Sequence, residues 1–410
     1  MPATDQHHEP SRASWRLTGW GLIAVVVALV HNRLWAAPNL GAFADIAAEL
    51  GSDPFGADSS SDYLLSNLSM PALARLTGQT QPHQYATLHL IVLLVGLAVC
   101  VVLAFRHHGY RTARTLTVLL AASPAVTVSM QWLGQPDALT FPLGVATVLV
   151  RRRSVFAGLA VLLGTTHPEQ ALFLVAVAAV VRAWVVPEAM SGAWSDRLRR
   201  LVPELVAGLG GVVLGRLLTE VYLRVFDIGV ARPRSDYLRL GTEVLVEHHG
   251  RAPWSLLYLL WGPLWLVAGS VVVLRIVGRH DHDRSMGRSW TVLGVLALLA
   301  LVPVAITLDE TRVYAMITAP VLGAAAVLLT REMSSRGAVG QRVLVGASAL
   351  LLAVTSVVPG GFTAGEDAWS TEIPTGDFID YLRTGDAPNE PVFLWLLSPF
   401  DFVFPDVDEG

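Results

Sequence analysis

The chain has 410 residues, of which 53% are hydrophobic and 15% are charged, and its mean hydropathy is +0.52. Soluble domains carry about 25% charged residues, so this composition excludes an ordinary soluble protein. The net charge of −4 indicates no particular partner, and binding to nucleic acid is not expected. The sequence predicts an all-α polytopic membrane protein whose first partners are membrane lipids.

Cysteine content and the first apolar segment set two further limits. The single cysteine, Cys100, lies inside an apolar run, which excludes an intrachain disulfide and a cysteine-ligated metal site. The first apolar segment runs into "HNRLWAAPNL", which has no clear small-residue cleavage site. A cleavable signal peptide is therefore not expected.

Apolar runs near the ~20 residues needed to cross a bilayer recur along the chain. Two of them, 138–150 and 154–166, are too short to cross about 30 Å at 1.5 Å per residue. We expect these two to extend into their polar flanks or to be half-deep helices inside a bundle. In chain order the eleven predicted spans are 17–36, 87–105, 113–132, 138–150, 154–166, 170–185, 201–225, 253–275, 289–307, 313–330 and 340–359.

The arginines give these spans an orientation. An excess of basic residues marks cytoplasmic loops, and the arginine-rich loops all fall on one side of this scheme. They are "RHHGYRTAR", "RRR", "SDRLRR", "GRHDHDRSMGR" and "REMSSRGAVGQR". This predicts a plasma (inner) membrane protein with its N-terminus inside and its C-terminus outside. The predicted division is a cytoplasmic tail 1–16, a transmembrane domain 17–360 and an extracytoplasmic tail 361–410.

The predicted outer side carries a long first loop, 37–86, which is rich in aspartate and glutamate. Its segment "YLLSNLSMPALARLTG" has an amphipathic pattern and is expected to lie on the membrane surface. The tail contains "PVFLWLLSPFDFVF", which is too short to span and too apolar to be solvated. We expect that run to dock on the outer face of the bundle.

Four polar clusters fall at outer helix ends: "HNR", "GQPD", "HPEQ" and "LDETR". Ionisable groups at membrane depth cost a few kcal/mol and are usually retained for function or pairing. Each cluster alone reads equally as a solvated loop tip, but four on one side favour a common outer-face site. The predicted substrate-binding residues are Arg33, Asp137, His167, Glu169, Asp309 and Arg312.

No phosphate-binding loop, dinucleotide fingerprint, zinc-protease motif or cysteine nucleophile is present. An enzyme with carboxylates and arginines at the outer face would therefore use a lipid-borne donor. A carboxylate would take the proton from an acceptor hydroxyl, and Asp45, Asp53, Asp58 and Asp62 are the candidates. Arginine would hold the leaving phosphate through charge-assisted hydrogen bonds. The candidates for contact with this phosphate are Arg33, His167 and Arg312. No cofactor and no metal ion are expected.

One span followed by a loop with an early aspartate, "FADIAAELGSDPF", then "DYLLSNLSMPALARLTG" and a second span, resembles the GT-C superfamily of polyprenyl-phosphate-sugar glycosyltransferases. The similarity is to its bacterial mannosyl- and arabinosyltransferase-like branches. It implies a GT-C-like bundle and inverting sugar transfer to a hydroxyl of a glycan, glycolipid or protein. The aspartate that follows the first span would be the general base; Asp45 matches that position and Asp62 is the reserve. No acidic pair lies close to Asp45, which disfavours the metal-dependent branch.

Other interpretations remain open. In "HPEQ", His167 and Glu169 either line a donor pocket, or Pro168 makes a turn, Glu169 starts a helix and His167 is solvated. A transporter or lipid flippase is an alternative, with Arg216 and Glu220 as a possible buried pair at a spacing of four residues. A non-catalytic scaffold of cell-envelope assembly is the other alternative.

Overall fold

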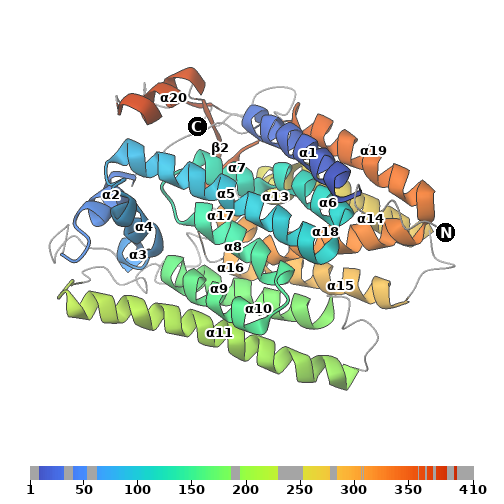
Figure 1. Ribbon diagram of the computed structural model, residues 1–410, viewed down its shortest axis with the longest axis horizontal. Helices are drawn as coiled ribbons and strands as arrows, with labels where there is room; N and C mark the ends of the chain where they lie inside the picture. Colours follow the sequence, from blue (N-terminus) through green and yellow to red (C-terminus); the bar gives the residue numbers. More distant parts are fainter. Residues whose placement is uncertain are drawn as a thin grey trace, which may run out of the picture.

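The structure is a computed structural model, and the chain folds into a bundle of helices (Figure 1). A small helical cluster lies at one end of this bundle, and a short mixed segment follows its last helix. The described residues are 9–31, 40–52, 62–185, 194–229, 253–277, 284–305, 307, 309–358, 360–364, 367–372, 375–385 and 392–394.

The bundle helices follow the predicted spans one by one. They are α1 Glu9–His31, α5 Pro82–His108, α6 Tyr110–Ala121, α7 Pro124–Gln131, α8 Asp137–Leu149, α9 Arg153–Thr166, α10 Pro168–Trp184, α11 Trp194–Val225, α13 Pro253–Trp261, η3 Gly262–Leu264, α14 Trp265–Val277, α15 Arg284–Leu299, α16 Leu301–Val304, α17 Glu310–Ile317, α18 Ala319–Ser335 and α19 Gly337–Thr355.

Within the described residues, five helical segments are long and apolar enough to cross a membrane, and seven if each of two bent pairs counts as one span. The protein is therefore an integral multi-pass membrane protein. The predicted number of eleven spans and their orientation remain predictions. The two runs predicted to be short, α8 and α9, have 13 and 14 residues.

The two bent pairs have local causes in the sequence. Helix α6 meets α7 at 52° across Ser123, whose side chain accepts the amide of Ala125, while Pro124 provides the first helical position. Helix α17 meets α18 at 50°, and Pro320 in the first turn of α18 explains the break there. The apolar runs of the sequence predicted one span for each pair, 113–132 and 313–330.

Glycines bring α9 and α11 close together. A Cβ atom on Gly215 would lie 2.3 Å from the carbonyl oxygen of Val161, and one on Gly164 would lie 2.4 Å from that of Val212. Small residues let helix backbones approach in membranes. The contact fixes the end of α9, which leads directly into His167.

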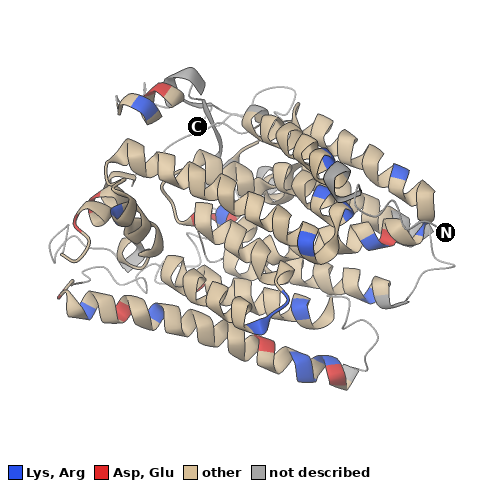
Figure 2. Cartoon of the chain, in the orientation of Figure 1, with Lys and Arg blue, Asp and Glu red and all other residues tan. Residues whose placement is uncertain are grey.

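The two ends of the bundle differ in charge (Figure 2). At one end lie the start of α11 and the ends of α5 and α18, and arginines gather there; this is the arginine end. We call the other end the α2 end. There the ends of α1 and α19 are joined by a hydrogen bond of 2.9 Å between Nδ1 of His31 and the carbonyl oxygen of Val358.

The first loop forms three short helices at the α2 end: α2 Leu40–Ala48, α3 Asp62–Leu65 and α4 Ser69–Thr77. Helix α4 buries Met70 and Ala74 and leaves Leu76 exposed by 84%, in keeping with an amphipathic surface helix. We call the described residues 40–52 and 62–81 the cap.

The segment after α19 is not wholly helical. Strand β1 Phe362–Ala364 pairs antiparallel with β2 Asp367–Glu372, and β2 pairs antiparallel with β3 Val392–Leu394. The fold class is all-α in the membrane part, as predicted, whereas the tail contains these three strands and α20 Thr375–Thr384.

Helix α20 lies against α5 at the α2 end. The ring of Tyr381 lies edge-on to that of His83, with centroids 6.4 Å apart, and burial raises the pKa of the Tyr381 hydroxyl. Of the apolar run 391–404 only residues 392–394 are described, so its docking stays a prediction.

Candidate active site

A buried ion-pair network forms where the polar clusters "GQPD" and "LDETR" meet. Asp137, fully buried, is the first residue of α8, and Arg312, 6% exposed, is in the first turn of α17. Nε of Arg312 lies 3.1 Å from Oδ2 of Asp137, and its Nη1 lies 3.0 Å from Oδ2 of Asp309. Two predicted site residues from one cluster thus meet one from another.

The surroundings of this network are polar and aromatic. Helix α17 packs against α7, α8 and α10. The guanidinium of Arg312 lies 5.9 Å from the centroid of the Trp132 ring, within the range of a cation–π contact. Gln131, which precedes Trp132 in the sequence, and Glu310, which follows Asp309, are both buried.

Electrostatics explains why Asp137 tolerates its position. Removal of a carboxylate from water is costly, and a nearby cation offsets that cost. Arg312 supplies the cation, and the positive ends of α8 and α17 stabilise the acidic residues in their first turns. Since Asp309 shares the guanidinium, the charge of Arg312 is neutralised by two carboxylates. A clamp for a phosphate is therefore not the role that this geometry favours for Arg312.

The "HPEQ" cluster is a sharp junction between α9 and α10. Pro168 cannot continue α9 but suits the first position of α10, and Glu169 follows in the first turn. His167 is only 2% exposed, and its Nδ1 lies 3.8 Å from Oε2 of Glu169, whose side chain is 44% exposed. The interpretation of His167 as a solvated tip is therefore wrong, while the structural reading of Pro168 and Glu169 fits.

The cap reaches three of these helix ends. Gly134 in "GQPD" lies so close to Leu40, the start of α2, that a Cβ atom on it would be 2.6 Å from Leu40 Cδ1. The amide of Leu68 donates to the carbonyl of Thr165 at 3.1 Å, two residues before "HPEQ". The amide of Gly51 donates to the hydroxyl of Tyr222 near the end of α11 at 2.8 Å.

The two predicted bases lie on this cap. Asp45 is exposed on α2 and, within the described part of the chain, forms no ion pair. It lies five residues after the helix start at Leu40, past the first turn of α2. Asp62 is the first residue of α3. Asp53, Asp58 and Arg33 lie outside the described residues.

The transporter pair takes a different form from the one predicted. Nη2 of Arg216 lies 2.7 Å from Oε1 of Glu220, but the two side chains are 29% and 36% exposed, so the pair is not buried. Nη1 of Arg216 also donates to Oγ of Ser66 in the cap. These contacts tie α11 to the cap.

Sequence reasoning missed Gln131 and Glu310, which no motif marks. The sequence marks them only by position: Gln131 lies three residues before "GQPD", and Glu310 lies inside "LDETR". Among the described residues, no group of three or more histidine, cysteine, aspartate or glutamate side chains is arranged to hold a metal ion.

No protein-family model matches the sequence, and no curated protein matches it significantly. The crystal structure of ArnT from Cupriavidus metallidurans in the apo state is similar to this chain. The alignment covers 91% of this chain and 69% of that chain, with a TM-score of 0.45 and 19% sequence identity. The similarity extends over nearly the whole chain, but at this TM-score it carries no argument about donor, acceptor or catalytic residues.

Proposed function

We propose that the protein transfers a sugar from a polyprenyl-phosphate-linked donor to a hydroxyl acceptor, with inversion, at the extracytoplasmic face of the plasma membrane. The observation that carries the proposal is the buried Asp137–Arg312–Asp309 network, next to the contact of Gly134 with Leu40 of the cap helix that bears the exposed carboxylate of Asp45. Buried ionisable groups in a membrane protein mark functional sites more often than structural ones. The sequence resemblance to the GT-C superfamily gives the class of reaction.

Each side chain has a part in this proposal. Asp45 takes the proton of the acceptor hydroxyl, because it is exposed, forms no ion pair with a described residue and sits on a helix that packs against α5. Asp137 and Asp309 accept hydrogen bonds from sugar hydroxyls, and Arg312 is a positioning residue that fixes both carboxylates. His167 donates to an oxygen of the donor phosphate or sugar. Glu169 closes the "HPEQ" side of the site.

Purified protein in proteoliposomes tests the proposal directly. The assay supplies polyprenyl-phosphate sugars and a membrane extract from a strain that lacks the protein, which provides the accumulated acceptor. Consumption of one donor, dependent on the extract, is the expected result. No consumption of any donor with any extract contradicts glycosyl transfer.

The same vesicles separate this function from transport. A flippase would change the leaflet in which the lipid-linked sugar is accessible and would leave the sugar–phosphate bond intact. A non-catalytic scaffold would do neither. Inversion is then read from the anomeric configuration of the product.

A further inference from the structure

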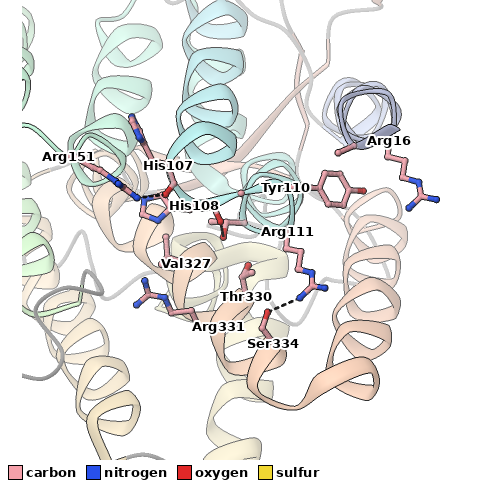
Figure 3. Close-up of a pocket in the computed structure, with 13 residues that line it drawn as sticks. Arg16, His107, His108, Tyr110, Arg111, Arg151, Val327, Thr330, Arg331 and Ser334 are labelled. Carbon is pink, nitrogen blue, oxygen red and sulfur yellow. Dashed lines mark hydrogen bonds between the residues drawn. The ribbon is translucent and has the colours of Figure 1, made fainter. Parts of the chain in front are cut away.

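A pocket of about 970 Å³ lies at the arginine end (Figure 3), just beyond the end of α8, whereas Asp137 of the candidate active site is at the start of that helix. It is formed by the end of α5, the start of α6, the loop between α8 and α9, the last turns of α18 and the first part of α1. Its basic lining residues are Arg16, His107, His108, Arg111, Arg151 and Arg331.

Among the described lining residues there are basic side chains and hydroxyls but no carboxylate. Four arginines and two histidines belong to this described lining. Arg16, Arg111 and Arg151 form no ion pair within the described part of the chain. Positive charge is thus concentrated around this pocket.

Three other arginines near this end have carboxylate partners. Arg182 and Arg153 share the carboxylate of Glu204, with distances of 2.7 and 3.2 Å. Arg336 lies 3.4 Å from Oε1 of Glu332. The pocket residues Arg16, Arg111 and Arg151 differ from these three, because they form no ion pair with a described residue.

The pocket is also held in shape. Nη2 of Arg151 donates to the carbonyl oxygen of His107 at 2.9 Å, and Nη1 of Arg111 lies 3.5 Å from Oγ of Ser334 (Figure 3). The first turn of α6, from Tyr110 to Thr112, lines the pocket and adds the positive end of a helix. The donors around this pocket therefore come from several elements.

We propose that this pocket binds a phosphate group as a second ligand site, separate from the site of sugar transfer. Guanidinium groups bind phosphate oxygens through paired, charge-assisted hydrogen bonds, and carboxylates would repel the same group. The headgroup of an anionic phospholipid is one source, since basic pockets between membrane helices hold such headgroups. A small soluble phosphate is the other source.

The test compares wild-type protein with two double variants. Arg16→Gln with Arg111→Gln removes two pocket charges that have no carboxylate partner. The control, Arg106→Gln with Arg152→Gln, removes two exposed charges at the same end that do not line the pocket. All three proteins are placed in nanodiscs of phosphatidylcholine with a minor share of phosphatidylglycerol, and retained phosphatidylglycerol is measured by native mass spectrometry after release. In a second arm, the shift in Tm caused by pyrophosphate is measured in neutral detergent.

For a lipid ligand, the pocket variant retains roughly tenfold less phosphatidylglycerol than wild type, whereas the control retains as much as wild type. For a soluble ligand, pyrophosphate raises Tm of wild type and control but not of the pocket variant. Equal loss in pocket variant and control, or binding of neither probe to the wild type, overturns the proposal. Equal Tm values without ligand show that all three proteins are folded.

Discussion

The guanidinium of Arg312 lies between two carboxylates of different burial, Asp137 at 3.1 Å and Asp309 at 3.0 Å. The side chain of Asp137 is fully buried, and that of Asp309 is 38% exposed. Burial decides how much a charge depends on its partner, because solvent screens the exposed pair and not the buried one.

Removal of the Arg312 guanidinium should therefore lower the free energy of unfolding, mainly because Asp137 is left as an unpaired buried charge. Arg312→Ala leaves a buried carboxylate without its counter-ion and should destabilise the protein by about 3–5 kcal/mol. Asp309→Asn should cost no more than ~1 kcal/mol, because that carboxylate remains solvated. Unfolding in detergent micelles measures both, and equal losses would contradict the different roles given to the two partners.

A double variant isolates the pair. Arg312→Ala combined with Asp137→Asn removes both charges, so it should be less destabilised than the sum of the two single variants by at least ~1 kcal/mol. Additive losses would mean that Arg312 and Asp137 do not interact.

The contact of α9 with α11 offers a matched pair of glycine substitutions. A Cβ atom on Gly211 would lie 2.7 Å from the carbonyl oxygen of Ala157, whereas one on Gly210 would meet nothing within 4 Å. Gly211→Ala should destabilise the protein by about 1–3 kcal/mol through overpacking. Gly210→Ala should leave stability unchanged or raise it. Equal unfolding midpoints would show that the helices separate freely at this point.

Much of the membrane fold was predictable because helices that lie in lipid need long runs of apolar residues, which are visible in the sequence. The predicted apolar runs coincide with helices or groups of helices over the described residues, whereas the number of eleven spans and the side on which each loop lies stay predictions. The bends at Ser123 and Thr318 were not predicted, since a break inside an apolar run leaves the hydropathy unchanged.

The candidate site was predictable only in part. Asp137, Asp309 and Arg312 were chosen as polar residues at helix ends, but the pairing of Asp137 with Arg312 depends on the packing of α8 against α17. No local pattern records that contact. Helix α2, which holds Asp45, begins at Leu40, and Leu40 packs on Gly134, a contact between distant segments that no local pattern records.

The orientation across the membrane can be tested by cysteine labelling in intact cells. Ser52→Cys places an exposed thiol on the cap, and Arg152→Cys places one in the loop between α8 and α9. An impermeant maleimide should label position 52 in intact cells and position 152 only after permeabilisation. Cys100 is 1% exposed, so the unaltered protein is the unlabelled control. The opposite pattern would place the cap in the cytoplasm and end the proposal of an outer-face site.

The role of Asp45 as general base yields the decisive substitution. Because Asp45 lies in the middle of α2 with an exposed side chain, Asp45→Asn removes neither a cap nor an ion pair. Its free energy of unfolding should stay within ~0.5 kcal/mol of wild type. The amide cannot accept a proton at neutral pH, so the rate of sugar transfer should fall by ~10²–10⁴.

The control for this variant is Glu49→Gln, which removes a second exposed carboxylate just after α2. Donor binding should persist in both variants, since the base is not asked to hold the phosphate, and only Asp45→Asn should lose turnover. If Asp45→Asn transfers sugar at the wild-type rate, Asp45 is not the base. Loss of turnover in Asp62→Asn would then move the base to the start of α3, still on the cap, and leave the proposed reaction intact.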